Sequence, residues 1–271
     1  MNCHCHTPPA EAPSERPKVL CYTVALDLKE VKSYRQQARM MVASLERSGF
    51  WGDIKIIHNG ETEIFDCPHP NVEEIRIDSP LTTTDCYQVK FQARKLLPVE
   101  DYDWVLFLDT DIIVSTSLDG WFDGPEFIRY ATEPMLEIQL PQFNGFLTED
   151  EMSNLKRDGI NSGAFVIKAE YFQEVLALWE KIDTGEATRS KGSDQPAWNR
   201  LLLDTPLPTK LLAQPEVSYF YHHSQLMQML GAPLLHYCGC WDEDKIQAMQ
   251  AKFITHFHTD EDGTLIGQLA R

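Results

Sequence analysis

Two carboxylates, Asp109 and Asp111, directly follow the apolar run Trp104–Leu108 in the segment WVLFLDTDIIV. Carboxylates one residue apart can converge on a single cation where the chain turns, and hard oxygen ligands suit Mg²⁺ or Mn²⁺. Such ions usually keep positions open for water or for a substrate phosphate. If Asp109 and Asp111 were only solvent-exposed turn residues, they would not need a buried apolar strand before them. The apolar run that precedes the pair therefore favours a metal site.

The balance of charge bears on what the chain can bind. With 41 acidic against 24 basic residues, its formal net charge is −17. A surface this negative repels the phosphate backbone of nucleic acid and the headgroups of anionic membranes, so we expect neither as a partner. A phosphorylated ligand could bind only where a local positive charge offsets this repulsion. A divalent metal ion is the obvious source of that charge.

Length and composition indicate a globular enzyme. The chain has 271 residues, of which 43% are hydrophobic and 24% charged, and its seven cysteines are scattered without a framework spacing. No apolar run approaches the roughly 20 residues that span a bilayer, so we expect no transmembrane segment. Reduced thiols and the lack of a signal-peptide core predict a cytoplasmic protein. We expect residues 1–16 to be a disordered tail and residues 17–271 to form one domain.

Strand-like and helix-like segments alternate up to the carboxylate pair. The strand-like segments are KVLCYTVALD (18–27), DIKIIHNG (53–60), VEEIRID (72–78) and WVLFL (104–108). Segments 29–50 and 85–103 carry apolar residues at helical spacing. This alternation predicts an α/β domain with a mostly parallel sheet flanked by helices. In such sheets ligands bind at the carboxyl ends of the strands, where the carboxylate pair lies.

Beyond residue 118 the periodicity weakens. Residues 118–160 are rich in aromatics, Pro and Gly, and we expect them to form a long functional loop. Regular structure is predicted to return with the strand NSGAFVIK (161–168), helices at 170–182 and 196–204, a strand at 232–239 and a helix at 242–253.

Four motifs resemble, in matching order, those of glycosyltransferases with the GT-A fold. YDWVLFLDTDIIV resembles their Asp-x-Asp segment, NSGAFVIK their Asn-(Ser/Ala)-Gly segment, GSDQPAWNRLL their Asp-Gln segment and LLHYCGCWDEDK their His-x-x-Gly segment. The order is that of the glycogenin-like, retaining family eight, and the resemblance extends from residue 18 to about 245.

This resemblance implies a single, Rossmann-like GT-A domain and a metal-dependent glycosyltransferase (hexosyltransferase). The enzyme would move a sugar from a nucleotide-diphosphate donor, a UDP-sugar, to an acceptor. The acceptor would be a glycan, a lipid-linked sugar or a protein, and the loop at 118–160 would form part of its binding surface.

The resemblance also implies a metal site and a nucleotide site. Asp109 would contact both ribose and metal, and Asp111 with His236 would hold Mn²⁺ (or Mg²⁺) against the donor diphosphate. Lys90 and Lys245 would offset the charge of the leaving diphosphate. The end of the first strand would flank the base and ribose, through Thr23, Ala25 and Asp27.

Further positions would surround the donor sugar. Asn161 and Asp194 would hydrogen-bond the sugar hydroxyls, with Ser162 in the same pocket-lining segment. Gln195 would lie beside the anomeric carbon. Gly239 belongs to the histidine segment and supports His236 as the third metal ligand.

The histidine segment departs from the family pattern His-x-x-Gly-x-x-Lys-Pro-Trp. Gly239 is followed by CWDEDK, so Lys245 comes late and no Pro-Trp follows. A second candidate for the third metal ligand is His256 or His258 in FITHFHTDED. The spacing to Gly239 favours His236.

Other functions stay open at this point. Asp-x-Asp after a strand also occurs in Asp-dependent phosphatases, and a nucleotidyltransferase shares the nucleotide and metal requirements. A catalytically silent nucleotide-sugar-binding scaffold is a third alternative. For a transferase the stereochemistry is open too, because an inverting enzyme needs a carboxylate base and Asp194 could serve as one.

Overall fold

The structure is a computed structural model. It describes residues 16–27, 33–65, 70–78, 83–133, 136–137, 141–155, 158–185, 194–212, 217–219, 232–238 and 245–251. The expected tail at residues 1–16 therefore lies outside the described residues, except for Arg16.

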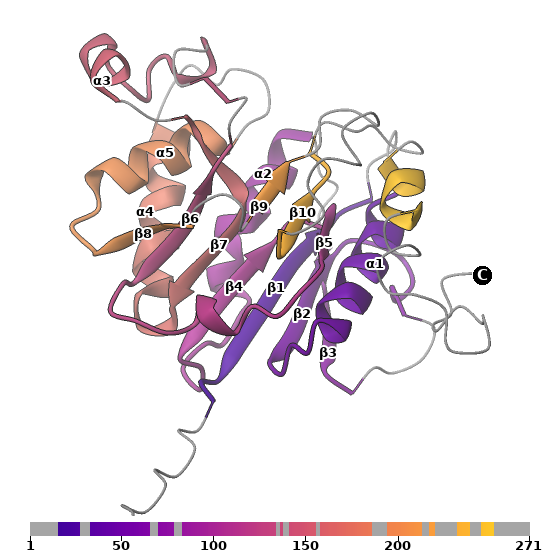
Figure 1. The fold of residues 1–271 in the computed structure, drawn as a ribbon. Helices are drawn as coiled ribbons and strands as arrows, with labels where there is room; N and C mark the ends of the chain where they lie inside the picture. Colours follow the sequence, from indigo (N-terminus) through magenta and orange to yellow (C-terminus); the bar gives the residue numbers. More distant parts are fainter. Residues whose placement is uncertain are drawn as a thin grey trace, which may run out of the picture.

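A seven-stranded sheet forms the centre of the molecule (Figure 1), in the order β3-β2-β1-β4-β7-β6-β8. Its strands are β1 (Val19–Ala25), β2 (Asp53–His58), β3 (Val72–Arg76), β4 (Trp104–Leu108), β6 (Ile128–Thr132), β7 (Ile160–Lys168) and β8 (Thr209–Leu212). Neighbours from β3 through β4 pair in parallel, as do β6 and β8, whereas β7 runs antiparallel to both β4 and β6. The prediction of an α/β fold with a mostly parallel sheet is confirmed.

Helices cover both faces of this sheet. They are α1 (Tyr34–Arg47), α2 (Thr83–Gln92), α3 (Glu149–Asn154), α4 (Ala169–Gly185) and α5 (Gln195–Asp204), with 3₁₀ turns at Ala93–Lys95, Asp119–Trp121 and Pro141–Phe143. α1 packs on one face, and α2, α4 and α5 pack on the other (Figure 1). Within the described part of the chain, no helix has the length and apolarity needed to cross a membrane.

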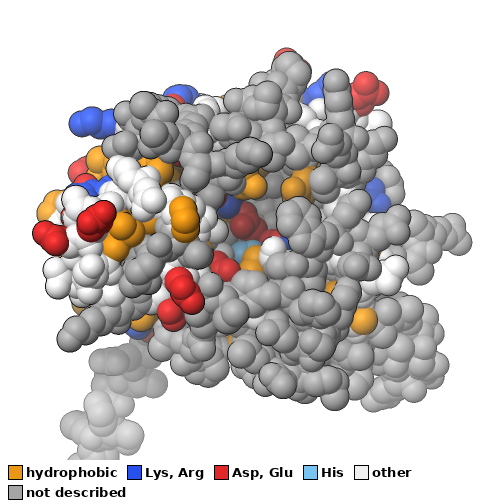
Figure 2. All heavy atoms as spheres, turned by 90° about the horizontal axis from the view of Figure 1, so that it is seen from above, with side chains coloured by type: hydrophobic (Ala, Val, Ile, Leu, Met, Phe, Trp, Pro, Cys, Tyr) orange, Lys and Arg blue, Asp and Glu red, His pale blue; other side chains and the backbone are white. Residues whose placement is uncertain are grey.

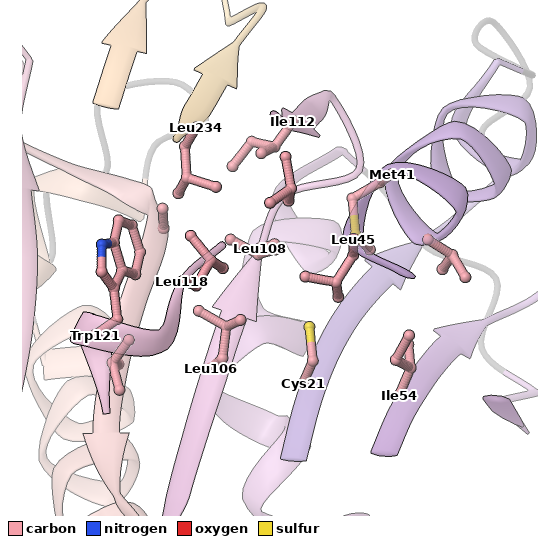
Figure 3. Packing of buried hydrophobic residues seen from close by; sticks show 14 of the residues in the cluster. Cys21, Met41, Leu45, Ile54, Leu106, Leu108, Ile112, Leu118, Trp121 and Leu234 are labelled. Atoms are coloured by element: carbon pink, nitrogen blue, oxygen red, sulfur yellow. The ribbon is translucent and has the colours of Figure 1, made fainter. Parts of the chain in front are cut away.

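Strand β4 is buried along its whole length because both faces of the sheet are covered. Leu106 and Leu108 lie in the same cluster as Met41 and Leu45 of α1 (Figure 3). On the other face, the ring of Phe107 belongs to the cluster beneath α4 and α5. Double burial explains why this strand is a continuous apolar run rather than an alternating one.

A second, three-stranded sheet lies beside α1, in the order β5-β10-β9. Its strands are β5 (Ile112–Val114), β9 (Val217–Tyr219) and β10 (Leu234–His236). The expected strand at 232–239 is thus shorter than predicted. β5 continues the apolar run of β4 in sequence, so only the turn at Asp109–Asp111 separates the two strands in space.

The expectation of a long loop at 118–160 is wrong in part, because this segment contains β6 and α3. β6 carries Arg129, which breaks the apolar pattern although its side chain is fully buried. Its guanidinium lies 5.1 Å from the ring centroid of Trp104 and donates to the carbonyl of Gly120 at 3.0 Å. It also lies 3.7 Å from Oδ1 of Asp123 and 3.5 Å from Oε2 of Glu126, so two nearby carboxylates balance the buried charge.

Candidate active site

The predicted carboxylate pair lies at the carboxyl end of β4. Asp109 follows the strand, and its backbone N–H donates to the carbonyl of Gly163 on β7 at 2.7 Å. The chain then turns through Thr110 into β5, and the N–H of Ile112 donates back to the carbonyl of Asp109 at 3.3 Å. This turn directs both carboxylates into the same space.

His236 completes a group of three possible metal ligands. β10 pairs with β5 so that His236 lies opposite Ile112. Its Nε2 is 3.1 Å from Oδ1 of Asp111 and 3.8 Å from Oδ2 of Asp109. One ligand atom from each of the three residues lies within 4.8 Å of the others. Two carboxylates and an imidazole form a donor set that fits a divalent cation.

Gly163 is required where β7 passes the metal-ligand group. A Cβ at this position would lie 2.4 Å from Cε1 of His236 and 2.5 Å from Oδ2 of Asp109. Backbone and ligands therefore approach more closely than any side chain allows. This gives a physical reason for the glycine in NSGAFVIK.

Lys90, on α2, lies between two carboxylates. Its Nζ is 3.0 Å from Oδ1 of Asp109 and 3.0 Å from Oδ2 of Asp194. All three side chains are largely buried, so their charges interact across little water. The two motifs that supply the aspartates, 85 residues apart in sequence, are joined by this lysine.

Lys245 also reaches the site despite its late position in sequence. Its Nζ donates to Oδ2 of Asp111 at 2.5 Å. Residues 245–251 are helical, and Lys245 is the first described residue of that segment. Asp111 thus presents one oxygen to His236 and the other to Lys245.

These contacts shift the pKa values of the cluster. Burial alone would raise the pKa of Asp111, but Lys245 and His236 hold it well below its usual range. Burial would lower the pKa of His236, yet the Asp111 carboxylate raises it above its ordinary value. For Asp109, burial raises the pKa even though Lys90 opposes the shift. Asp111 is therefore the more strongly ionised carboxylate of the pair in the metal-free protein.

A pocket of about 300 Å³ opens over these residues. Figure 2, which looks onto the carboxyl ends of the strands, shows acidic side chains and a histidine inside a hollow. Nine of the predicted site residues line it: Lys90, Asp109, Asp111, Asn161, Ser162, Asp194, Gln195, His236 and Lys245. The structure therefore brings together side chains from all four sequence motifs and from α2.

The end of β1 is placed differently. Thr23 and Ala25 are fully buried in the interior, whereas their neighbours Val24 and Leu26 line the pocket. Asp27 does not line it, and its backbone N–H donates to Oδ1 of Asn59 at 2.7 Å. Because side chains alternate along a strand, Val24 rather than Thr23 or Ala25 lines the pocket. That the end of β1 flanks a base and ribose stays a prediction. Gly239, His256 and His258 lie outside the described residues.

Several pocket residues escaped the sequence analysis. Gln37 on α1 is buried, and its Oε1 accepts a hydrogen bond from Thr110 Oγ1 at 3.1 Å. Its Nε2 donates to Ser33 Oγ at 2.8 Å, so the turn between the carboxylates is tied to α1. The sequence did offer a signal for Gln37, because it is a polar residue on the buried, mostly apolar face of this helix. The others are Val24, Leu26, Ser33, Tyr34, Tyr87, Thr110, Gly163 and Cys238.

Comparison with curated proteins finds a related sequence within a longer protein. No protein-family model matches the chain. It is 31% identical over 185 residues to UDP-glucuronate:xylan alpha-glucuronosyltransferase 2 of Arabidopsis thaliana. The match covers 64% of this chain and 30% of that protein, so the chain spans less than a third of its relative's length.

Solved structures match over most of the chain. The galactosyltransferase LgtC, solved with donor and acceptor sugar analogs, has a TM-score of 0.63 at 14% identity, covering 90% of this chain and 98% of LgtC. The bifunctional glycosyltransferase WbbM has a TM-score of 0.60 at 14% identity, covering 90% of this chain and 51% of WbbM. The chain therefore has the GT-A fold of these glycosyltransferase structures.

Proposed function

We propose that the chain is a metal-dependent glycosyltransferase that moves a hexosyl group from a nucleotide-diphosphate sugar, a UDP-sugar, to an acceptor hydroxyl. The observation that carries this proposal is the convergence of Asp109, Asp111 and His236 with two buried lysines in one pocket. Similarity to proteins named as glucuronosyl- and galactosyltransferases supports the reaction class.

Asp109, Asp111 and His236 would hold the metal ion. A borderline imidazole ligand beside carboxylates favours Mn²⁺ over Mg²⁺. When bound, the ion would supply positive charge for the donor diphosphate and for the charge that develops on it as a leaving group. Such a cation is also what an acidic protein of formal charge −17 needs in order to bind a diphosphate.

The two lysines would add the protein's own positive charge to the diphosphate site. Lys245 Nζ already lies against Asp111, so a phosphate beside the metal would be within its reach. Lys90 Nζ lies between Asp109 and Asp194, next to the proposed sugar position. Fixed charges in a water-poor pocket stabilise a developing anion without reorganisation.

The sugar would occupy the part of the pocket lined by Asn161, Ser162, Asp194 and Gln195. Asn161 and Asp194 would hydrogen-bond its hydroxyls, and Gln195 would lie beside the anomeric carbon. The nucleoside would lie at the end of β1. Val24 and Leu26 supply pocket-facing side chains there, and Thr23, Ala25 and Asp27 shape the backbone.

The pairing of Asp194 supports transfer with retention. An inverting transfer needs a carboxylate that can accept the acceptor proton. Among the residues that the structure describes, the carboxylates lining the pocket are Asp109, Asp111 and Asp194, and each contacts a lysine ammonium. A carboxylate that already accepts from a buried ammonium is a poor base. In a retaining transfer the acceptor proton can pass to an oxygen of the departing diphosphate instead.

General features of the chain are what bear on the identity of the acceptor and on the cellular compartment. A glycan, a lipid-linked sugar or a protein would each supply the hydroxyl. Cys21 and Cys238 are free thiols, which supports a reducing compartment such as the cytoplasm.

The test is thermal stability in the presence of nucleotides and UDP-sugars, with Mn²⁺ or with a chelator. A ligand at about 100 times its Kd stabilises the folded state by about 2.7 kcal/mol. We expect a Mn²⁺-dependent shift with UDP and with one UDP-sugar, lost in Asp111→Asn. Asp101→Asn is the matched control, because Asp101 is exposed and distant from the pocket.

The products then separate the alternatives. Release of UDP from a UDP-sugar indicates a transferase or its hydrolytic side reaction, and binding without turnover indicates a silent scaffold. Pyrophosphate from a nucleoside triphosphate and a sugar phosphate would indicate a nucleotidyltransferase. Inorganic phosphate from a phosphomonoester would indicate a phosphatase. Absence of any nucleotide-induced shift would refute the proposed function.

A further inference from the structure

Glu133, which follows β6, is a buried carboxylate just behind the pocket. Its side chain is among the buried polar groups, at 7% exposure, and it does not line the pocket. Oε2 accepts a hydrogen bond from Nδ2 of Asn161 at 2.7 Å. Oε1 lies 3.8 Å from Sγ of Cys238. Glu133 therefore joins β7 of the central sheet to the segment that leaves β10 of the small sheet.

The contact with Glu133 fixes the orientation of the Asn161 amide. Oδ1 of Asn161 accepts from the backbone N–H of Gly163 at 2.6 Å, while Nδ2 donates to Glu133. A side-chain amide has two N–H donors, so one remains after the bond to Glu133. Because Asn161 lines the pocket, this remaining donor is the group it can offer to a ligand.

The backbone around Glu133 is itself anchored. Its N–H donates to the carbonyl of Gly159 at 2.9 Å, and its carbonyl accepts from Leu136 N–H at 2.9 Å. The β6–β7 register shifts between Tyr130 and Ala131, immediately before this point. Such irregularities redirect side chains near functional sites. Hydrogen bonds of its N–H and its carbonyl thus fix the backbone of Glu133.

The contact with Cys238 links the same carboxylate to the metal-ligand group. Cys238 lines the pocket and lies two residues after His236. The thiol of Cys238 donates to Oε1 of Glu133. A single buried carboxylate therefore holds a pocket-lining amide and the segment carrying His236.

We propose that Glu133 is a positioning residue for the donor sugar: it orients the Asn161 amide so that its free N–H meets a sugar hydroxyl. This inference rests on the proposed function. Asn161 would contact the sugar rather than the nucleotide, so Glu133 should affect the affinity for a UDP-sugar and leave the affinity for UDP unchanged. A purely structural role would weaken both.

The experiment compares Kd values of Mn²⁺–UDP and Mn²⁺–UDP-sugar by calorimetry for wild type, Glu133→Leu and Glu133→Gln. We expect Glu133→Leu to weaken UDP-sugar binding by on the order of tenfold relative to UDP, the value of one hydrogen bond. Glu133→Gln should restore most of it, because its amide carbonyl can accept from Asn161 Nδ2. Glu137→Gln, at an exposed glutamate, is the matched control.

Each outcome decides the inference. Equal weakening of both ligands by Glu133→Leu, or no weakening, would overturn it, as would the absence of rescue by Glu133→Gln. If wild type binds UDP but no UDP-sugar more tightly than UDP, the sugar-positioning role fails while the nucleotide site stands. If wild type binds neither, the proposed function fails and the role of Glu133 fails with it.

An NMR measurement on wild type covers the case in which Glu133→Leu does not fold. The Asn161 side-chain amide, assigned through Asn161→Asp, should show one strongly deshielded proton that moves in Glu133→Gln. Two equivalent, solvent-like amide protons would overturn the proposed orientation.

Discussion

Lys245 Nζ and Asp111 Oδ2 are 2.5 Å apart, although 134 residues separate them in sequence. The same carboxylate presents Oδ1 to Nε2 of His236 at 3.1 Å. Asp111 is therefore shared between a permanent cation of the protein and the group that would bind a metal. The family pattern places its lysine earlier, and the fold nevertheless brings this late lysine to the site.

Replacing Lys245 by Met should change metal and nucleotide binding in opposite directions. Without the ammonium, Mn²⁺ should bind the nucleotide-free protein several-fold more tightly, because like charges at one carboxylate repel. UDP should bind the Mn²⁺-loaded protein more weakly, by on the order of tenfold, the value of one charge-assisted hydrogen bond. Electron paramagnetic resonance of free Mn²⁺ measures the first effect and calorimetry the second. Weakening of both would indicate damage to the fold instead.

Mn²⁺ binding should depend on pH through His236. The imidazole must lose its proton to bind a metal, and its pKa in the metal-free protein is raised above 6.5. Apparent Mn²⁺ affinity should therefore rise as the pH increases above 6.5. Titration between pH 6 and 8 by the same resonance signal measures this, and the slope should be absent in His236→Asn.

The metal-free protein should show the opposite trend in stability. Because the folded state raises the pKa of His236, the folded state holds its proton more tightly than the unfolded state does. The stabilisation from this proton is complete below pH 6.5 and is lost as the pH rises through the folded-state pKa. Urea denaturation with a chelator present should show the loss. An unchanged or rising contribution from His236, measured against His236→Asn, would contradict it.

Gly163→Ala should damage the metal site. The added Cβ would lie 2.4 Å from Cε1 of His236 and 2.5 Å from Oδ2 of Asp109, so one of the two ligands must move. We expect loss of at least tenfold in Mn²⁺ affinity and destabilisation of about 1–3 kcal/mol, typical of overpacking. Gly120→Ala is the control, because a Cβ there meets nothing within 4 Å. Equal effects of the two substitutions would contradict the steric argument.

Lys90→Met should destabilise the metal-free protein strongly. It leaves Asp109 and Asp194 without the ammonium that lies 3.0 Å from each. Removing one partner of a buried ion pair costs about 3–5 kcal/mol. Lys95→Met is the control, since its pair with Glu180 is half exposed and worth about 0–1 kcal/mol. Urea denaturation measures both, and the deficit of Lys90→Met should shrink at low pH as Asp109, whose pKa burial raises, takes up a proton.

The part of the site that lies within one continuous segment could be predicted from sequence. The apolar run of β4 followed by Asp109 and Asp111 indicated a buried strand and a turn with candidate metal ligands. The strand is buried, and the two carboxylates lie with His236 in a group that could hold a metal ion. His236 was preferred over His256 and His258 from its spacing to Gly239, and it is found 3.1 Å from Asp111. Local patterns were sufficient for the strand and the turn, because both are encoded in adjacent residues. His236 lies far away in sequence and was identified through the resemblance of its segment to a family motif.

Other features could not be predicted because their cause lies in distant contacts. β6 was taken for a loop because the periodicity of residues 118–160 is weak. Its buried Arg129 lies over the ring of Trp104, a contact 25 residues away in sequence, and pairs with Glu126 and Asp123. Glu133 gave no signal at all, since its partners Asn161 and Cys238 are 28 and 105 residues away.

The sequence by itself determined the fold class, because the alternation of strand-like and helix-like segments follows from residue type and spacing. It also supplied the order of the motifs and, through their resemblance to a family, the candidate metal ligands. The tertiary structure alone decided which charges meet: Lys90 with Asp109 and Asp194, and Lys245 with Asp111. It also decided that Val24 rather than Thr23 faces the pocket. The physical reason is that electrostatic pairing and side-chain direction depend on distances between elements, which sequence spacing does not contain.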